Sequence, residues 1–237
     1  MAVKKNIFII GANSFLGLHL LKDLDNNFTN SNFYLLSRKK FELSSNDKNN
    51  FFYFICDLAD KDQVLKITKE MLDRSNRKID YVIFLAISKT NDSFDNISLE
   101  KIDNDININI RSTIIIIKKI LPYLIQKNSG HIINISSGTG ISGVENASLY
   151  SMSKGAIQVL MESIKDELVS KNILITNFFT GYINNNNVTK ISAKIVKNIN
   201  TNKFNFFVQK YVYFSFLIKI FPSLKILFRL FRKVFLK

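Results

Sequence analysis

The feature that most constrains the fold of this chain is a series of apolar runs separated by segments with a helical pattern. Strands are predicted over residues 3–10, 33–37, 51–60, 81–88, 131–136 and 172–179. The fourth run, YVIFLAIS, is apolar almost throughout. Apolar runs that alternate with helices are typical of a parallel sheet buried on both faces. The sequence therefore predicts an α/β fold with a doubly wound parallel sheet.

Helices are predicted between these runs. Residues 60–75 have their apolar positions on one side of an amphipathic helix. Longer helices are predicted over residues 99–125 and 150–170. The chain has 237 residues, which is enough for one such domain with a sizeable core. We expect this domain to occupy residues 1–200 and the remaining residues, 201–237, to form a basic hydrophobic tail.

The first apolar run ends in a turn, GANSFLG, that reaches from Gly11 to Gly17, and a helical pattern follows it. A strand, a glycine turn and a helix in this order are the context of a dinucleotide-binding site. Gly11 permits the tight turn and Gly17 allows close packing of helix and strand, as in a Rossmann-type unit. Backbone N–H groups at the start of the helix can bind a pyrophosphate. The residues between these positions are further candidates for cofactor contacts: Asn13, Ser14, Phe15 and Leu16.

The second predicted strand ends at Ser37 and is followed by Arg38. In a Rossmann-type unit, an acidic residue at this point binds the ribose 2′-OH of NAD, whereas an Arg nearby accommodates the 2′-phosphate of NADP. Arg38 therefore favours NADP as the cofactor, with NAD as the alternative. The competing interpretation is a solvated basic loop formed by Arg38, Lys39 and Lys40.

Residues 136–154 carry the predicted chemistry. Tyr150 and Lys154 are four residues apart, so they share one face of a helix, and Ser137 lies at the end of the preceding strand. A phenol exchanges protons poorly at neutral pH, and a nearby ammonium lowers its pKa. With Ser137 holding a substrate carbonyl, these groups can protonate an alkoxide as a hydride reaches the carbon. Tyrosine and lysine at this spacing also occur on ordinary helices, where their role is structural.

Cysteine and histidine usage limits other chemistry. Cys56 is the single cysteine, which excludes an internal disulfide. His19 and His131 lie far apart in the sequence and beside no acidic or cysteine cluster, so no metal site is predicted. The apolar run near the N-terminus is too short for the core of a signal peptide. A cytoplasmic protein is therefore expected.

Charge is distributed unevenly along the chain, whose formal net charge is +14. No acidic residue follows Glu167, whereas twelve basic residues do. This asymmetry favours a polyanionic partner, either nucleic acid or an anionic membrane surface. A bias in the base composition of the gene would also explain the many Asn, Ile and Lys residues.

The last segment has an amphipathic helical pattern. Its apolar face comprises Leu224, Leu227, Phe228, Phe231 and Phe235. Its basic face comprises Lys225, Arg229, Arg232 and Lys233. This combination favours a helix that lies on anionic lipid, and the longest uncharged run, 211–218, is shorter than the roughly 20 residues of a membrane-spanning helix. The alternatives are packing on the domain itself or on a dimer partner. Nucleic acid is disfavoured because no reader motif accompanies the charge.

Together these features resemble the short-chain dehydrogenase/reductase family over roughly residues 4–186. The resemblance rests on motifs in a fixed order: the glycine turn, DLAD at Asp57, NINIRST around Asn109, GHIINISS, YSMSKGA and Thr180-Gly181. Phe15 stands where the family's usual turn has its middle glycine, and Ser14 where a related branch has glycine. The alanine of the family's NNAG motif is retained as Ala86.

The resemblance implies roles for individual residues. Tyr150 would be the catalytic acid–base, and Lys154 would lower its pKa and bind the nicotinamide ribose. Ser137 would position the substrate carbonyl, and Asn109 would support a water of the proton relay. The remaining implied cofactor contacts are Asp57 and Leu58 at the adenine, Ala86, and Ile183 near the carboxamide.

These expectations define an NADP-dependent carbonyl reductase or alcohol dehydrogenase. The tail favours a lipid-linked or envelope-sugar substrate and a peripheral position on the inner face of the cell membrane. One alternative is a 3-oxoacyl-acyl-carrier-protein reductase, because a basic surface suits an acidic carrier. Another is a non-catalytic cofactor-binding scaffold at the membrane. Similar proteins form dimers through the helices predicted around 109–125 and 150–170, so a homo-oligomer is expected.

Overall fold

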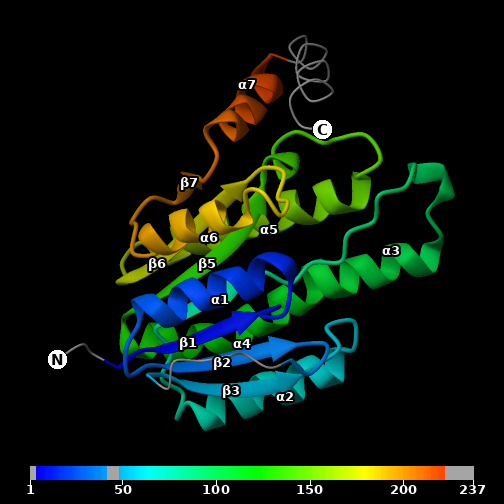
Figure 1. The fold of residues 1–237 in the computed structure, drawn as a ribbon. Coiled ribbons are helices and arrows are strands. Elements are labelled where there is room, and N and C mark those ends of the chain that lie inside the picture. Colours follow the sequence, from blue (N-terminus) through cyan, green and yellow to red (C-terminus); the bar gives the residue numbers. More distant parts are fainter. Residues whose placement is uncertain (1–3, 42–47, 222–237) are drawn as a thin grey trace.

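The computed structural model describes residues 4–41 and 48–221, and its centre is one seven-stranded sheet (Figure 1). The strands are β1 (Asn6–Ile10), β2 (Asn32–Ser37), β3 (Asn50–Ile55), β4 (Tyr81–Phe84), β5 (Gly130–Ser137), β6 (Ile173–Thr180) and β7 (Asn205–Phe207). They are ordered β3-β2-β1-β4-β5-β6-β7, and every neighbouring pair is parallel. The predicted doubly wound parallel sheet is therefore confirmed.

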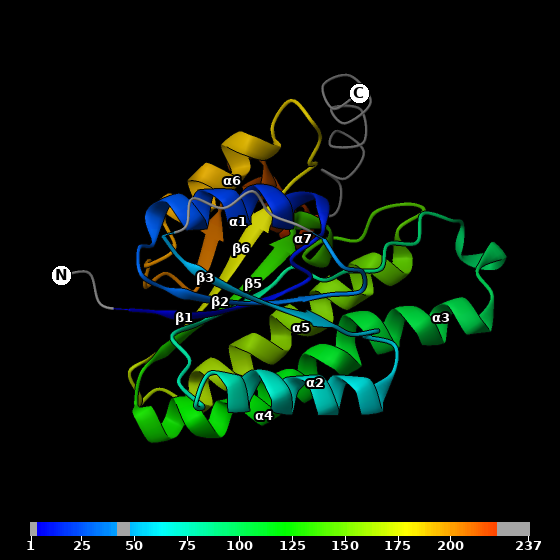
Figure 2. The same cartoon turned by 60° about the horizontal axis from the view of Figure 1, so that its bottom comes forward.

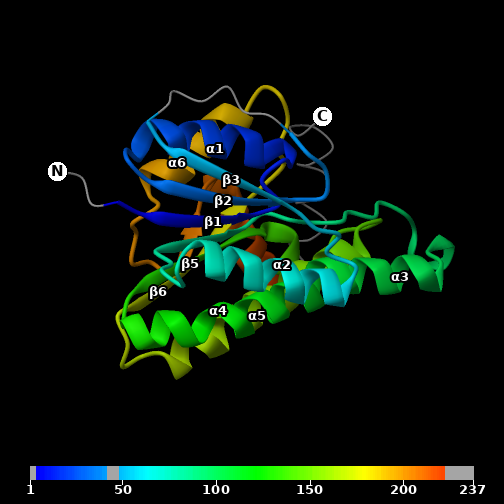
Figure 3. The same ribbon diagram turned by 90° about the horizontal axis from the view of Figure 1, so that it is seen from below.

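Helices cover both faces of the sheet (Figures 2 and 3). One face carries α1 (Phe15–Asn27) and α6 (Val188–Lys197). The other carries α2 (Lys61–Arg74), α4 (Ser112–Lys127) and α5 (Ser148–Glu167). A short helix, α3 (Leu99–Ile106), leads into α4, and α7 (Phe214–Ile220) follows β7. This arrangement explains why the central strands are apolar throughout: each has a helical layer against both of its faces.

The core consists of two layers because side chains alternate across each strand. In β1, Phe8 and Ile10 pack into the cluster that includes residues of α2, α4 and α5. Ile7 and Ile9 point the other way and pack with α1 and α6. All four side chains are almost completely buried. At about 25 cal/mol per Å² of apolar surface, burial on both faces is the main stabilising contribution in this part of the sheet.

One long helix was predicted over residues 99–125, but the structure divides it. A π-helical turn at Asn107–Arg111 separates α3 from α4. Such turns insert an extra residue into the helical ladder and occur frequently at functional sites. Here the turn coincides with the buried Asn109.

The sheet continues beyond residue 200, where we expected the domain to end. Residues Asn205–Phe207 form β7, which pairs with β6 from Asn177 to Phe179. The predicted amphipathic helix around 224–235 lies outside the described residues. Among the residues that are described, no helix is long and apolar enough to cross a membrane.

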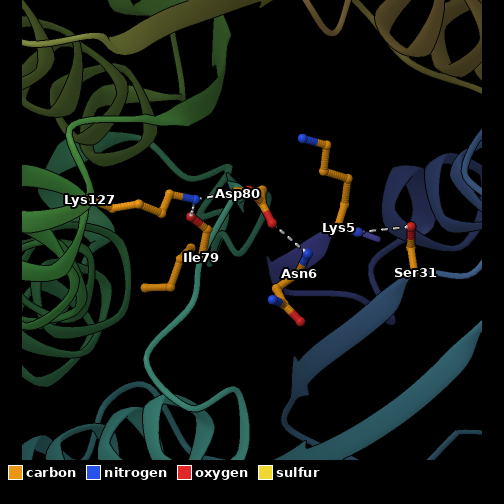
Figure 4. Close-up of polar contacts among 6 residues, drawn as sticks. All are labelled: Lys5, Asn6, Ser31, Ile79, Asp80 and Lys127. Atoms are coloured by element: carbon orange, nitrogen blue, oxygen red, sulfur yellow. Dashed lines mark hydrogen bonds and ion pairs between the residues drawn. The ribbon is translucent and has the colours of Figure 1, made fainter. Parts of the chain in front are cut away.

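Polar groups at the amino ends of the strands pair with one another (Figure 4). The Asp80 carboxylate accepts a hydrogen bond from the backbone N–H of Asn6 at 2.8 Å and pairs with Lys127 Nζ at 2.8 Å. Lys127 also donates to the carbonyl of Ile79. These bonds connect the end of α4 to the beginnings of β1 and β4, at the edge of the sheet opposite the carboxyl ends of the strands.

Candidate active site

The glycine turn between β1 and α1 requires its first glycine. Gly11 has φ +90°, and a Cβ atom built on it would lie 2.5 Å from the backbone nitrogen of Ala86. The Gly11 N–H donates to the carbonyl of Leu36 at 2.9 Å. Any side chain at residue 11 would therefore push apart the ends of β1 and β4, and Ala86 lies directly against the turn.

The second glycine and a helix cap complete this turn. A Cβ on Gly17 would lie 2.6 Å from the carbonyl oxygen of Ala12. Ser14 is the N-cap of α1, and its hydroxyl accepts a hydrogen bond from the Gly17 N–H at 3.2 Å. Leu16 is buried. The turn is thus compact, and it presents the amino end of α1, which suits an anionic group such as a pyrophosphate.

Phe15 does not fill the turn, although it stands where the resemblance suggests a glycine. Its side chain is 47% exposed and packs edge-on against His19, one turn along α1, with 5.5 Å between ring centroids. The residues present therefore fit a dinucleotide at this turn, because the larger side chain points along the outer surface of α1.

The loop after β2 lies next to the glycine turn. The Ser37 hydroxyl donates to the carbonyl of Lys39 at 2.7 Å, and the Asn13 side-chain amide donates to the same carbonyl at 3.5 Å. Arg38, which lies between Ser37 and Lys39 in the sequence, is exposed. The basic side chain predicted to select NADP is consequently close in the fold to the residues predicted to bind the pyrophosphate.

Asp57 and Leu58 follow β3 at the same edge of the sheet. The Asp57 carboxylate is exposed and accepts a hydrogen bond from the Ala59 N–H at 3.0 Å, whereas Leu58 is buried. Arg111 donates to the carbonyl of Ala59 at 2.6 Å. This contact attaches the loop after β3 to the start of α4. Asp57 and Leu58 thus occupy one loop fixed between the end of β2 and the start of α4, and their contact with an adenine stays a prediction.

Tyr150 and Ser137 come together from α5 and the end of β5. Tyr150 is in the first turn of α5, and its phenol lies near enough to Ser137 for that side chain to influence its pKa. Burial raises the pKa of Tyr150 above its usual value, and the Ser137 side chain partly opposes this increase. Ser137 Oγ accepts hydrogen bonds from the Thr139 N–H at 3.3 Å and the Thr139 hydroxyl at 3.1 Å.

Lys154 lies one turn further along α5. It is 8% exposed, and its Nζ donates to the carbonyl of Ile135 at 2.6 Å. Nζ is 5.9 Å from the centroid of the Tyr150 ring. Burial lowers the pKa of Lys154 to about 8. We expected the ammonium to lower the pKa of Tyr150, but the burial of the phenol dominates in this structure and raises it.

Two glycines that the sequence analysis did not single out bring α5 close to the loop after β5. A Cβ on Gly140 would lie 2.8 Å from the backbone carbon of Lys154, and one on Gly155 would lie 3.0 Å from the carbonyl oxygen of Gly140. Close approach of the two backbones is what holds Tyr150 beside Ser137. A strand followed by GTG and a helix with Gly after its lysine is the signal that was available in the sequence.

Asn109 forms hydrogen bonds that hold the loop after β4. Its side-chain oxygen accepts a hydrogen bond from the Ser88 N–H at 2.7 Å, and its amide donates to the Ser88 carbonyl at 2.9 Å. The same amide lies 3.4 Å from the hydroxyl of Ser153 on α5. Asn109 therefore joins the π-helical turn, the loop after β4 and α5. Its role in a proton relay remains a prediction.

The loop after β6 is supported by the segment that follows β7. Gly181 donates its N–H to the side-chain oxygen of Gln209 at 2.6 Å, and the Tyr182 N–H donates to the Tyr211 hydroxyl at 2.8 Å. A Cβ on Gly181 would lie 1.9 Å from that hydroxyl. Ile183, the residue predicted to approach the carboxamide, is half-buried against the cluster of α1 and α6.

The predicted site residues therefore gather along one edge of the sheet, at the carboxyl ends of β1, β2, β3, β4, β5 and β6. Ligands bind at this edge in open α/β sheets, near the point where the strand order reverses. Within residues 4–41 and 48–221, no group of three or more His, Cys, Asp or Glu side chains is arranged to hold a metal ion.

Comparison with protein families gives a direct match. A family model described as "short chain dehydrogenase" matches residues 5–196. An uncharacterized oxidoreductase of Staphylococcus epidermidis is 28% identical over 127 residues, which cover 54% of this chain and 55% of the relative. The ketoacyl reductase HetN of a Nostoc species is 31% identical over 128 residues, which cover 53% of this chain and 45% of HetN. The match thus spans about half the length of these relatives.

Solved structures share the fold. A short-chain dehydrogenase from Streptomyces avermitilis superposes with a TM-score of 0.79 at 15% identity and covers 99% of both chains. ElxO with NADP bound gives a TM-score of 0.74 at 21% identity and covers 89% of this chain and 99% of ElxO. At these identities the likeness establishes the architecture.

Proposed function

The chain belongs to the short chain dehydrogenase family, and we propose that it is an NADP-dependent oxidoreductase that interconverts a carbonyl and a secondary alcohol. The observation that carries this proposal is the convergence of Tyr150, Ser137 and Lys154 at the carboxyl end of β5. The Ser137 side chain is close enough to Tyr150 to lower its pKa, and a buried ammonium lies on the next turn of the same helix. The glycine turn with the loop after β2 supplies a matching dinucleotide site.

The glycine turn and Arg38 would hold NADP, which when bound would supply the hydride for reduction and accept it in oxidation. Ser137 Oγ holds the substrate oxygen. Tyr150 Oη donates a proton to this oxygen as negative charge develops there. The raised pKa of Tyr150 keeps the phenol protonated and so competent as an acid. Lys154, with its pKa near 8, is mostly charged at neutral pH and stabilises the phenolate that remains.

The proton relay needs a path from Tyr150 to solvent. We propose that Asn109 supports a water on this path. In favour of this role, the π-helical turn at Asn107–Arg111 interrupts the regular ladder of backbone hydrogen bonds beside α5. The Asn109 side chain is bonded to Ser88, and its backbone carbonyl accepts a hydrogen bond from the Thr113 hydroxyl at 3.3 Å, so a water would share that carbonyl through its second lone pair.

NADP is the proposed cofactor because Arg38 is exposed beside the glycine turn. An Arg guanidinium can form paired hydrogen bonds to a phosphate. ElxO, which shares the fold, has been crystallised with NADP. NAD remains the alternative cofactor.

Carbonyl-dependent oxidation of NADPH by the full chain tests the proposal. We expect turnover of at least one carbonyl compound in a panel that includes a 3-oxoacyl-acyl-carrier protein. That substrate is the second candidate, favoured by the 31% identity with the ketoacyl reductase HetN. NADPH binding without turnover of any compound would instead support the non-catalytic scaffold.

A lipid-linked or envelope-sugar substrate at a membrane surface is a further proposal. It rests on the basic and apolar faces predicted for residues 224–235, which lie outside the described residues. Sedimentation with anionic vesicles tests it: the full chain should pellet at low salt and less at high salt, because salt screens the attraction. Equal recovery in the supernatant with and without vesicles would contradict it.

We also propose a homodimer formed by α4 and α5. Apolar side chains are exposed on these helices at Ile114, Met152 and Val159. The substitution Val159→Glu should shift the chain towards monomer in light scattering. Val169→Glu, at an exposed valine beyond the end of α5, is the matched control and should leave the mass unchanged.

A further inference from the structure

A lysine outside all the recognised motifs lies beside the catalytic tyrosine. Lys89 belongs to the loop after β4, and its Nζ is 5.5 Å from the centroid of the Tyr150 ring. We propose that Lys89 binds an anionic group of the substrate, a carboxylate or a phosphate, located a few bonds from the reacting carbonyl. The proposal rests on the proposed function, because it assumes that this carbonyl is held by Tyr150 and Ser137.

The backbone on both sides of Lys89 is fixed. Before it, Ser88 makes two hydrogen bonds with the Asn109 side chain, at 2.7 and 2.9 Å. After it, the Thr90 hydroxyl donates to the Asp105 carboxylate at 2.6 Å, and these two residues are 2% and 0% exposed. The chain is therefore anchored to buried groups at the residues before and after Lys89, while Lys89 itself is exposed. A ligand-binding group held in this way loses little backbone entropy on binding.

The two lysines near Tyr150 differ in what they can do. Lys154 is buried and its ammonium donates to the Ile135 carbonyl. Lys89 is exposed, and in the described part of the chain no carboxylate forms an ion pair with it. Its ammonium lies over the face of the Tyr150 ring. Lys154 is thus placed to act on the phenol, and Lys89 is free to accept a negatively charged partner from solution.

The location of Lys89 favours the substrate over the cofactor phosphates. The groups proposed to bind those phosphates, Arg38 and the glycine turn, follow β2 and β1. Lys89 follows β4, which neighbours β1, but its ammonium lies 5.5 Å from the centroid of the ring of the residue proposed to donate the proton, and this contact favours the substrate. A carbonyl compound bound to Tyr150 and Ser137 would bring an acidic substituent towards this ammonium. Carbonyl compounds with a carboxylate or phosphate near the carbonyl therefore form the predicted substrate class.

Matched pairs of compounds test this inference with the full chain. The carboxylate pair is acetoacetate and ethyl acetoacetate, and the phosphate pair is dihydroxyacetone phosphate and dihydroxyacetone. For the preferred anion, Lys89→Met should lower kcat/KM about 10- to 100-fold through a higher KM, as expected for loss of a charge-assisted contact. The neutral partner should be unaffected, and Lys89→Arg should retain most of the activity. Lys66→Met, at an exposed lysine on α2, is the matched control and should behave as the wild type.

Three results would overturn the inference. The first is an equal loss of kcat/KM for the anion and for its neutral partner, or a shifted pH profile for the neutral compound. Either would mean that Lys89 acts on Tyr150. The second is an increase in the Kd of NADPH that accounts for the whole fall in kcat/KM of Lys89→Met. The third is a wild-type protein that prefers neither anion to its neutral partner.

A binding measurement separates this inference from the proposed function. Calorimetry of each compound with the Tyr150→Phe variant in the presence of NADP needs no turnover. Tighter binding of an anion that is lost in the Tyr150→Phe, Lys89→Met double variant supports the Lys89 site even if the wild type reduces nothing. Turnover of neutral carbonyls without such a preference would leave the oxidoreductase proposal intact and exclude the anion site.

Discussion

The two edges of the sheet use the same kinds of side chain in opposite ways. At the amino ends of the strands, Asp80 and Lys127 pair with each other and with backbone groups of β1 and of the residue before Asp80. At the carboxyl ends, the exposed ammonium of Lys89 and the exposed guanidinium of Arg38 have no ion-pair partner among the described residues. A charge that is already paired stabilises the fold, whereas a charge without a partner can bind a ligand.

His131 and Tyr150 extend this comparison to titratable groups. Both pKa values are shifted mainly by burial. His131, at the start of β5, is buried with Thr176 and is kept neutral, with its pKa lowered to about 4. Tyr150, beyond the other end of β5, is kept protonated beside Ser137. Burial fixes the protonation state at both ends of one strand, but only the second group faces the candidate site. Substitutions should accordingly affect stability at one edge and activity at the other.

The largest effect is expected at Tyr150. Tyr150→Phe keeps the ring and removes the proton donor, so kcat should fall about 10²- to 10⁴-fold while NADPH still binds. The melting temperature should change little, because the ring keeps its packing. Steady-state kinetics, NADPH titration and a thermal melt on the same preparation check this. A variant with nearly wild-type turnover would show that another group supplies the proton.

The next largest effect is expected from the protonation of His131. Well above pH 6.5 the imidazole is neutral in both folded and unfolded chains. Between pH 6.5 and about 4, the unfolded chain takes up a proton that the folded chain does not, so the free energy of unfolding falls with decreasing pH. The full change across this window is about 3 kcal/mol, from 1.36 kcal/mol per pKa unit. Denaturant unfolding at several pH values measures it.

Carboxylates also titrate at low pH, so a difference between variants is needed. His131→Gln should remove this part of the pH dependence, whereas His19→Gln, at the half-buried histidine of α1, should retain it. Identical pH profiles for the two variants would mean that His131 contributes nothing to acid sensitivity.

A smaller loss of stability is expected from the Asp80 network. Asp80→Ala removes the partner of Lys127 and of the Asn6 N–H, and the loss of such charged hydrogen bonds costs about 2 kcal/mol. The midpoint of urea unfolding should fall, while kcat/KM at a temperature well below the transition should not. Loss of activity in the folded variant would contradict the division between the two edges.

The sequence predicted the fold and the shared helical face of Tyr150 and Lys154 because both depend on local patterns. The order of apolar runs and helices was enough to predict the parallel sheet, and YSMSK puts Tyr150 and Lys154 on one helical face regardless of the surroundings. The π-helical turn was missed because it accompanies a contact between Asn109 and Ser88, which are 21 residues apart. The strand β7 was missed because three residues give no recognisable period.

The shift at Tyr150 and the position of Lys89 could not be predicted for another reason. A spacing in the sequence indicates which residues are neighbours, but not how far each is removed from water. Burial raises the pKa of Tyr150 although a lysine lies on the next turn, and only the folded loop after β4 places Lys89 over its ring. Both features depend on solvent exclusion and on loop geometry.

The smallest effect is expected at Arg38. It is also the most specific test of the exposed, unpaired charges at the carboxyl ends of the strands. Arg38→Asp replaces the proposed partner of the 2′-phosphate with a like charge, so the Kd of NADPH should rise about tenfold or more. The Kd of NADH should change little, because NADH lacks this phosphate. Arg38 is exposed and forms no ion pair within the described residues, so the melting temperature should also stay the same. Lys61→Asp, at an exposed lysine beginning α2, controls for a general loss of positive charge. Equal affinity of the wild type for NADH and NADPH would mean that Arg38 forms only a solvated loop. A selective loss of NADPH affinity without a loss of stability would show that a charge left unpaired by the fold is one that the ligand pairs.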